Sequence, residues 1–281
     1  MADAIKIGNT DITAFKVGSS NVDKIYLGST LLYPSTPPHD YSQDYLTFVA
    51  TSRMRIKNGN AFSYSINGGS TWLTLNANTY TISVTEGTKV LVKATQSMAG
   101  TFTISGGTSV TVEGNVMSLL YGDDFTGKTS VGNYALNNIF SGCSIISSAE
   151  NLVLPATTLG RGCYQGMFYK CYALQSAPVL PATTLAEDCY YLMFSNCSSL
   201  ATAPVLPAEI ILKNSYNQMF YNCYVLSNIT CLGTYIQSNG TYNWVSNVAS
   251  TGTFTKAASM TDWPSGVSGI PANWTVQDYS S

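Results

Sequence analysis

Apolar and polar positions recur at a fixed interval in the C-terminal half of the chain. Each unit carries the motif LPATTL or a weakened form of it, with a step of 26 residues. The three copies are Leu154–Leu159, Leu180–Leu185 and Leu206–Ile211. The motif Met-Phe-x-x-Cys keeps the same phase at Met167–Cys171, Met193–Cys197 and Met219–Cys223, with an earlier copy at Ile139–Cys143. Such self-similarity predicts a stack of equivalent coils.

Each unit is predicted to contain one extended segment and one short helix. Ala177–Pro181 should form a rung of a parallel ladder, because proline restricts its own backbone and disfavours helix at the residue before it. Thr184 then precedes Glu187 by three residues, as in a helix capping box. The apolar residues that follow at i, i+4 and i+8, the spacing of one buried helical face, are Leu185, Cys189 and Met193.

The period lies within the range of leucine-rich repeats. A single coil of this kind cannot bury its apolar face, so stacking supplies the stability and both ends need caps. We expect residues 115–142 to form the entry cap of a solenoid that ends at residue 231. Residues 232–281, which contain Trp244, Trp263 and Trp274, should form the C-terminal cap.

A second, shorter repeat of about ten residues occupies the N-terminal segment, residues 1–34. Its units are Ile5–Ile12, Phe15–Val22 and Ile25–Leu32. Each unit predicts a short strand, a glycine-containing turn and the start of a second strand, so three hairpins should make a small sheet. This sheet is too small to bury its own core and should pack on copies of itself or on a docking partner. The candidate docking and oligomerisation residues are Ile5, Ile7, Phe15, Val17, Ile25, Tyr26 and Leu27.

Between these repeats lie a proline-rich linker, residues 35–44, and a segment of alternating apolar and polar positions, residues 45–114. Asn67-Gly68-Gly69 is a hairpin turn signal within it. Seven or eight short strands in about 70 residues predict an immunoglobulin-like β-sandwich. The fold class expected is therefore mainly β with short helices, with an N-terminal β-hairpin segment, a sandwich and a C-terminal leucine-rich repeat solenoid.

Composition limits the partners. Charged residues make up 10% of the chain and the formal net charge is -2, so nucleic acid is not expected as a partner. A surface of Ser, Thr, Asn, Gly and Tyr suits contacts with glycan or protein, and equally suits a chain that only has to remain stable. No apolar run approaches the roughly 20 residues needed to span a membrane. If Met1 is the native start, Asp3, Lys6 and Asp11 interrupt every candidate secretory signal.

The cysteines, seven in number, fall mostly into repeat columns. One column is Cys143, Cys171, Cys197 and Cys223, and another is Cys163 and Cys189. This spacing is typical neither of a disulfide framework nor of a metal site, so buried, reduced thiols are expected, and no metal or cofactor.

The residues give no reason to expect catalysis. The one histidine, His39, lies in the linker, and the carboxylate pairs Asp123-Asp124 and Glu187-Asp188 are interpreted as structural. We expect no catalytic residues and no enzyme, although a glycosidase with two distant carboxylates remains an alternative.

Aromatic residues are the candidates for ligand binding. Tyr164, Tyr190 and Tyr216 share a repeat column and are expected to form a ladder on one flank of the stack, suited to recognition at low entropic cost. An interpretation at least as well supported is that the ladder only packs the helical side of the stack. Trp244 and Trp263 of the C-terminal cap offer a second candidate surface.

The pattern LPATTL…CYxxMFxxCxSLxxAP resembles that of BspA-like (Treponema pallidum-type) leucine-rich repeat surface proteins of gut Bacteroides and their crAss-like phages. The resemblance covers about residues 45–278, and Ile25–Thr30 is similar to N-terminal segments of gut-phage virion proteins. It implies surface recognition: adhesion to host proteins or glycans in bacterial members, and fibre or decoration roles in phage members.

The function expected from this resemblance is that of a non-enzymatic virion protein, a head or tail fibre or decoration protein. It would be assembled in the host cytoplasm and would dock on capsid, portal or tail proteins through residues 1–33. A homo-oligomer is expected, with a trimer favoured, that displays the repeats to a host-surface glycan or protein. The alternative is an adhesin on the bacterial cell surface.

Overall fold

The computed structural model describes residues 39–95 and 100–280, together with six short strands before them. The chain divides into two units, Met1–Asp40 and Tyr41–Ser281, which are described separately. The described fold is mainly β and contains one short α-helix, α1 (Ser118–Tyr121).

The N-terminal unit contains three separate hairpins. Their strands are β1 (Lys6–Ile7), β2 (Thr10–Asp11), β3 (Lys16–Val17), β4 (Ser20–Asn21), β5 (Ile25–Leu27) and β6 (Thr30–Tyr33). The antiparallel pairs are β1 with β2, β3 with β4 and β5 with β6. The predicted hairpins are therefore confirmed. Among the described residues each hairpin pairs only within itself, so the single small sheet expected from the repeat is not formed.

The second unit begins with a β-sheet region of two layers. Its strands are β7 (Leu46–Ala50), β8 (Met54–Asn58), β9 (Phe62–Ser65), β10 (Leu73–Leu75), β11 (Lys89–Ala94), β12 (Phe102–Gly106) and β13 (Val110–Asn115). The larger sheet has the order β10-β9-β11-β7-β13-β15, and β8 pairs separately with β12. The ring of Phe102 lies 4.9 Å from that of Phe48 and 5.8 Å from that of Phe62, so the two layers share an aromatic core.

This arrangement differs from the expected sandwich in two respects. The segment Thr81–Val84 forms only a bridge between Val84 and Met54, so the second layer stays small. The larger sheet also does not end within residues 45–114, because β13 pairs in parallel with β15 (Ile146–Ser148) and β16 (Leu152–Val153) of the first coil. The structure shows a β-sheet region that continues into the stack, and not an immunoglobulin-like sandwich.

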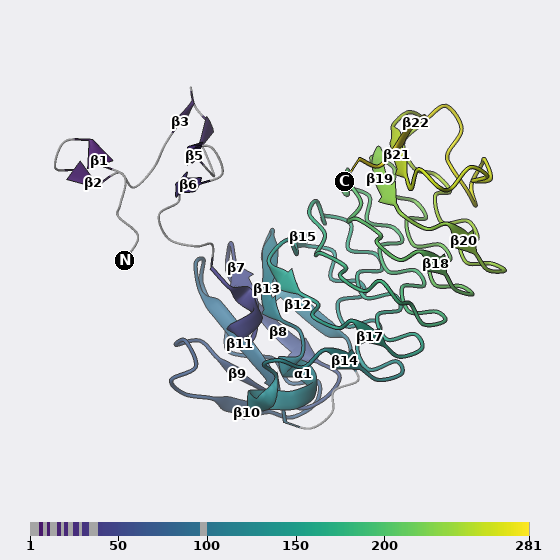
Figure 1. The fold of residues 1–281 in the computed structure, drawn as a ribbon. Helices are drawn as coiled ribbons and strands as arrows, with labels where there is room; N and C mark the ends of the chain where they lie inside the picture. Colours follow the sequence, from purple (N-terminus) through teal and green to yellow (C-terminus); the bar gives the residue numbers. More distant parts are fainter. Residues whose placement is uncertain are drawn as a thin grey trace. The chain divides into compact units, whose positions relative to one another are not determined.

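The rest of the unit is a solenoid-like stack of about six turns (Figure 1). Its short parallel strands are β14 (Ser130–Val131), β17 (Thr158–Leu159), β18 (Ile210–Ile211), β19 (Asn228–Cys231), β20 (Tyr235–Ile236), β21 (Thr253–Lys256) and β22 (Thr275–Asp278). Parallel pairs join β14 to β17, β18 to β20, and β19 to β21 and β22. The predicted stacking of coils is confirmed. The expected end of the solenoid at residue 231 is corrected, because β21 and β22 continue the parallel pairing beyond it.

The predicted rung at Ala177–Pro181 does not form a strand. A bridge joins Ser176 to Ser148 immediately before it, and the chain is then irregular. Pro178 and Pro181 have no amide hydrogen to donate, and the next coil carries Pro204 and Pro207 at the equivalent positions. Proline favours an extended chain here but removes the bonds that would make it a ladder.

The predicted helix after Thr184 is also wrong, because a run of tight turns replaces it. The Tyr191 amide donates to Asp188 O (3.1 Å) three residues back, whereas the Leu192 amide donates to Asn217 O (3.0 Å) of the next coil. Amides alternate in this way throughout the run, so no helical bond to the fourth preceding residue is made. The spacing i, i+4, i+8 arises from turns that repeat every four residues, and it still directs Leu185, Cys189 and Met193 into the core.

Residues in the left-handed region make this run of turns. Five successive coils each have three residues with positive φ, four positions apart. They are Tyr134, Asn138 and Gly142; Gly162, Gly166 and Lys170; Asp188, Leu192 and Asn196; Asn214, Gln218 and Asn222; and Asn239, Asn243 and Asn247. Asparagine and glycine dominate because they enter this region at the lowest cost. Side-chain amides add a ladder, in which Asn222 donates to Asn196 Oδ1 (3.0 Å) and Asn247 donates to Asn222 Oδ1 (2.8 Å).

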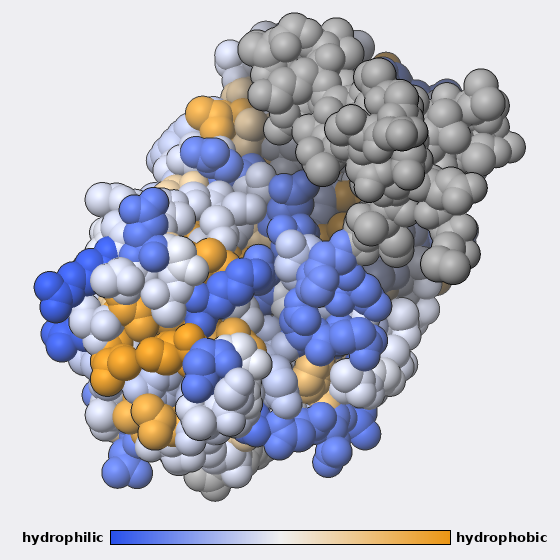
Figure 2. Space-filling model, turned by 90° about the vertical axis from the view of Figure 1, so that its left-hand side faces the viewer, coloured by the Kyte–Doolittle hydropathy of each residue, from blue (hydrophilic) through white to orange (hydrophobic). Residues whose placement is uncertain are grey.

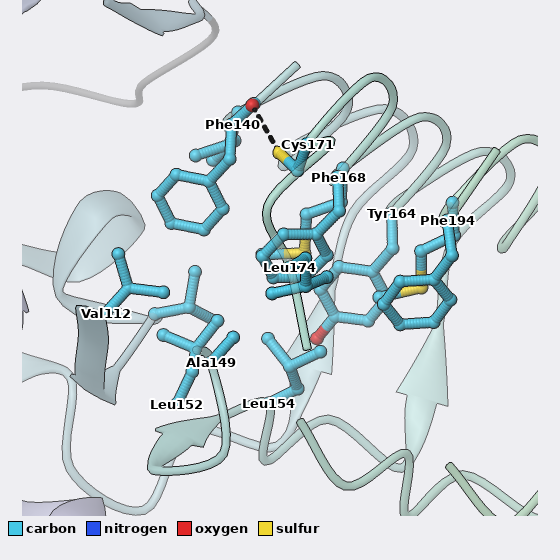
Figure 3. Packing of buried hydrophobic residues seen from close by; sticks show 14 of the residues in the cluster. Val112, Phe140, Ala149, Leu152, Leu154, Tyr164, Phe168, Cys171, Leu174 and Phe194 are labelled. Carbon is cyan, nitrogen blue, oxygen red and sulfur yellow. Dashed lines mark hydrogen bonds between the residues drawn. The ribbon is translucent and has the colours of Figure 1, made fainter. Parts of the chain in front are cut away.

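Columns of identical side chains fill the interior. Phe140, Phe168, Phe194 and Phe220 stack with ring centroids 5.3, 5.5 and 5.8 Å apart. Figure 3 shows Phe140, Phe168 and Phe194 in a row, above Leu152 and Leu154 and beside Val112 of the sheet region. Each buried ring contributes roughly 1.5–3 kcal/mol relative to an exposed one, so the column is a main source of stability.

We expect Asn222→Ala, which loses two side-chain hydrogen bonds, to lower the free energy of unfolding by roughly 3–4 kcal/mol. Alanine in the left-handed region costs roughly 1–2 kcal/mol, and each lost hydrogen bond adds about 1 kcal/mol. Asn222→Gly loses the side-chain bonds but keeps the backbone preference, so it should be less destabilising than alanine. Urea unfolding followed by circular dichroism measures both variants.

Asn137→Ala is the matched control, since Asn137 precedes the left-handed Asn138 but does not itself have a positive φ. An equal loss of stability for Asn137→Ala and Asn222→Ala would contradict the role given to the left-handed position.

Candidate functional site

The tyrosine ladder exists, but it lies in the core. Tyr164, Tyr190 and Tyr216 are 1%, 1% and 0% exposed. Tyr190 stacks on Tyr164 at 5.9 Å and on Tyr216 at 6.1 Å. The run of turns directs two adjacent residues inward in each group of four, Cys189 together with Tyr190 and then Met193 together with Phe194. A helix would have placed Tyr190 to one side of that face, so the expected flank position is corrected. The alternative, that the ladder serves packing alone, agrees with the burial, although turns and not helices carry the rings.

The hydroxyl groups of these tyrosines have no hydrogen-bond partner among the described residues. Burial is the main cause that raises the pKa of each phenol well above its usual value. Such a group stays neutral and cannot reach a partner at the surface. The column therefore offers no surface for a ligand.

The tryptophans of the cap close the aromatic columns. Trp244 is fully buried, lies 6.2 Å from the rings of both Tyr216 and Phe220, and donates its indole N–H to Gly269 O (2.8 Å). Trp263 is partly buried and stacks on Trp244 at 5.7 Å with the planes 9° apart. The expected binding surface around Trp244 is corrected, because this ring is core, whereas Trp263 anchors a surface segment.

The candidate docking residues of the N-terminal unit fall partly outside the described residues. Ile5 and Phe15 lie outside them. Ile7, Val17, Ile25, Tyr26 and Leu27 lie in strands β1, β3 and β5, of which the structure describes the backbone. Their side-chain roles stay predictions.

The seven cysteines are free and buried. The thiols of Cys171, Cys197 and Cys223 donate to Phe140 O (3.1 Å), Phe168 O (3.2 Å) and Phe194 O (3.1 Å), each one coil earlier. The Cys143 thiol likewise donates to Phe102 O (3.1 Å) and so links the first coil to the sheet region. Burial raises the pKa of the Cys143, Cys163, Cys223 and Cys231 thiols to about 12.

The carboxylate pairs have structural partners. Asp123 accepts hydrogen bonds from Lys93 Nζ and from the Tyr45 hydroxyl, each at 2.6 Å, which lower the pKa of this carboxyl group. Asp188 accepts bonds from Arg161 Nε (2.8 Å) and Asn214 Nδ2 (3.0 Å). Across residues 39–95 and 100–280, no group of three or more His, Cys, Asp or Glu side chains is arranged to hold a metal ion. No helix in the described part of the chain has the length and apolar character to cross a membrane.

A candidate site is a hollow of about 520 Å³ between strand β20 and residues 259–264. Thr234–Ile236, which includes strand β20, lines it on one side, and residues 259–262 with Pro264 line it on the other. Tyr235 is 60% exposed although its backbone pairs with Ile210 of β18. Asp262 supplies the carboxylate of the lining.

A smaller hollow of about 250 Å³ adjoins it on the preceding coils. Thr183, Thr184, Glu209 and Ile210 are among its lining residues. The Thr234 amide donates to Glu209 O (2.8 Å) and the Thr234 hydroxyl donates to Glu209 Oε1 (3.3 Å), so the linings of the two hollows are in contact.

A second surface feature lies on the sheet region. Figure 2 shows apolar groups gathered among polar ones on the face that is on the left in Figure 1. Leu73 on the edge strand β10 is 55% exposed, and Ile82 is 52% exposed. Both residues border Tyr64. Leu73 pairs with Tyr64 across the two strands, and the Ile82 amide donates to the Tyr64 hydroxyl (3.5 Å). An exposed edge strand of this kind is open to pairing with another chain.

Comparison of the chain with protein-family models, with curated proteins and with solved structures finds no match. The arrangement of the residues therefore carries the functional argument.

Sequence reasoning missed the hollow beside Tyr235. One signal was readable: Thr158, Thr184 and Ile210 occupy the column that Tyr235 continues, so an aromatic ring stands where earlier coils carry threonine or isoleucine. The position of Asp262 had no such signal, because residues 259–264 lie outside the repeats.

Tyr190→Phe should raise the free energy of unfolding by about 1 kcal/mol, because it removes a buried hydroxyl without a partner. Tyr190→Ala should lower it by roughly 3–5 kcal/mol through the cavity it leaves. Thermal unfolding of the three proteins tests this. A clear loss of stability in Tyr190→Phe would mean that bound water satisfies the hydroxyl.

A thiol reagent should not label the folded protein at pH 8, and it should label seven cysteines in denaturant. The raised thiol pKa values also predict that stability falls as the pH rises from about 9 towards about 12, because the unfolded chain ionises its thiols in that window and the folded chain does not. Rapid labelling without denaturant, counted by mass spectrometry, would contradict the burial of the columns.

Proposed function

We propose that this protein is a non-enzymatic binding and assembly protein whose stack is a BspA-like leucine-rich repeat module for adhesion to a host-surface glycan or protein. The observation that supports this best is the open, hydroxyl-lined flank with the exposed Tyr235, held on a stack whose interior is fully packed. Solenoids present extended surfaces of this kind to their partners.

The repeat assignment is supported by the period and by the parallel pairing of coils. The step of 26 residues is within the leucine-rich repeat range. The leucines of the repeat, among them Leu174, Leu200 and Leu226, are fully buried in equivalent positions.

We further propose a virion location, as a head or tail fibre or decoration protein that docks on capsid, portal or tail proteins through residues 1–33. Within the described strands of this unit each of the three hairpins pairs only with itself, and an open strand edge is a template for pairing with another chain. Closed rotational symmetry is the common solution for identical chains, and a trimer suits a fibre.

The second candidate is an adhesin on the bacterial cell surface, which would use the same flank. The free thiols favour the virion, because disulfides are common in exported proteins and all seven cysteines are unpaired.

The test compares the full chain with a chain that lacks residues 1–34, by light scattering and by binding to gut Bacteroides cells and to intestinal epithelial cells in flow cytometry. We expect the full chain to be oligomeric and to bind the bacterial cells. The shortened chain should be monomeric and should bind more weakly by about 10²-fold or more, because it loses multivalency. Its melting temperature should be unchanged, since Tyr41–Ser281 is a separate unit.

Preferential binding to epithelial cells would favour the adhesin instead. A monomeric full chain that binds neither cell type, or one that releases sugar from isolated surface polysaccharides, would contradict the proposal.

A further inference from the structure

We infer that the hollow between β20 and residues 259–264 binds a neutral sugar residue of a glycan, with Tyr235 and Asp262 as its principal contacts. This inference rests on the proposed adhesive function and assigns it a site and a ligand class. The volume of about 520 Å³ lies in the range of small-molecule sites, roughly 300–1,000 Å³, and accommodates more than a single small ion.

The lining has both kinds of surface that a pyranose ring presents. A pyranose has faces made of C–H groups and a rim of hydroxyl groups. The exposed ring of Tyr235 offers an amphipathic surface, at low entropic cost, on which a C–H face of the sugar can pack. Asp262 accepts hydrogen bonds from hydroxyl donors, and charged acceptors make the stronger bonds.

Hydroxyl groups complete the polar lining. Thr234, Ser259 and Thr261 each carry one group that both donates and accepts, so they can match the alternating donors and acceptors of a sugar rim. The Thr234 hydroxyl is already held by Glu209 at 3.3 Å, which leaves its lone pairs for a ligand donor.

The charges of the lining select against acidic ligands. Asp262 is the one charged side chain that lines the larger hollow, and Glu209 is the one that lines the smaller. Two carboxylates without a lining cation repel a sulfate, phosphate, uronate or sialate group. A neutral, hydroxyl-rich ligand fits this field, and an anionic one does not.

The site is held rigid by the core beneath it. Trp263, between Asp262 and Pro264, stacks on Trp244 at 5.7 Å and meets Phe254 edge to face at 5.2 Å. The Ile270 amide donates to Pro264 O (2.8 Å), which ties the end of the segment to the cap. A ligand that meets such a preorganised lining loses less entropy of the protein on binding.

The adjoining hollow extends the site along the stack. Thr183, Thr184 and Ile210 line it, and Glu209 of its lining accepts a hydrogen bond from Thr234 of the larger hollow. In this inference a glycan of several sugar residues extends from the larger hollow towards the smaller one, with one residue beside Tyr235.

The experiment titrates the full chain, by isothermal calorimetry, with neutral hexasaccharides of glucose, mannose, xylose and galactose and with acidic hexasaccharides from hyaluronan and polygalacturonate. We expect binding of at least one neutral probe and of neither acidic probe. Tyr235→Ala and Asp262→Asn should each weaken binding at least about tenfold, without loss of melting temperature.

Tyr224→Ala is the matched control, because Tyr224 is 58% exposed, close to the 60% of Tyr235, and does not line either hollow. It should leave the affinity unchanged. Glu150→Gln serves in the same way for Asp262, since Glu150 is an exposed carboxylate outside both hollows.

Three results would overturn the inference: no binding of any neutral probe, tighter binding of an acidic one, or equal affinities for the wild type and Tyr235→Ala.

Adhesion of the protein to cells distinguishes failure of this inference from failure of the proposed function. If cells still bind the protein after periodate oxidation of their glycans, the partner is a protein, and the adhesive function stands while the glycan site falls. If untreated cells do not bind it at all, the adhesive function itself fails.

Discussion

The column of backbone hydrogen bonds between successive coils is the constraint on which the rest of the structure depends. Along the turn face, alternate amides, such as those of Phe168 and Phe194, donate to Met193 O (2.9 Å) and Met219 O (3.0 Å) of the following coil. On this face every second amide points along the stack while the chain turns, and a left-handed residue at every fourth position produces this run of turns. Because these bonds fix the register of the coils, each side chain meets its own counterpart, and columns of rings and thiols result.

The sequence was sufficient to predict the columns but not the backbone that produces them. Period, stacking and the buried Met, Phe, Cys and Leu positions follow from the repeat itself. The helix prediction was wrong because turns of four residues and a helix of 3.6 residues per turn give the same apolar spacing over so short a segment. The spacing of four residues between Gly162 and Gly166, and between Asn239 and Asn243, was a readable sign of left-handed positions. In the coils between them the equivalent positions are occupied by Leu192 and Gln218, residue types that do not indicate this conformation.

The difference between a helix and a run of turns also explains why the candidate site does not lie at the tyrosine column, where it was expected. On a helix, adjacent residues such as Cys189 and Tyr190 point about 100° apart, so one can be core and the other flank. In the run of turns both point inward, and the tyrosine column becomes part of the core. The hollow beside Tyr235 could not be predicted, because it depends on where a non-repeating segment returns to the stack. That return is set by tertiary packing of Trp263 on Trp244, which no local pattern encodes.

The direction of the coil-to-coil bonds connects the cap to the hollow. Since the amides of the turn face point towards later coils, this face of the first coil leaves carbonyl groups, and that of the last coil leaves amides, without a repeat to pair with. At the start of the stack, the Phe102 amide of the sheet region donates a hydrogen bond to Ile139 O (2.8 Å). At the end, Val245 donates to Val267 O (3.2 Å) and Asn243 to Ser268 Oγ (2.9 Å). The chain must therefore return across the last coil at residues 265–270, and this return brings the preceding segment, with Asp262, beside β20. The hollow is a consequence of capping the stack, so its lining can change without disturbing the columns that hold the coils together.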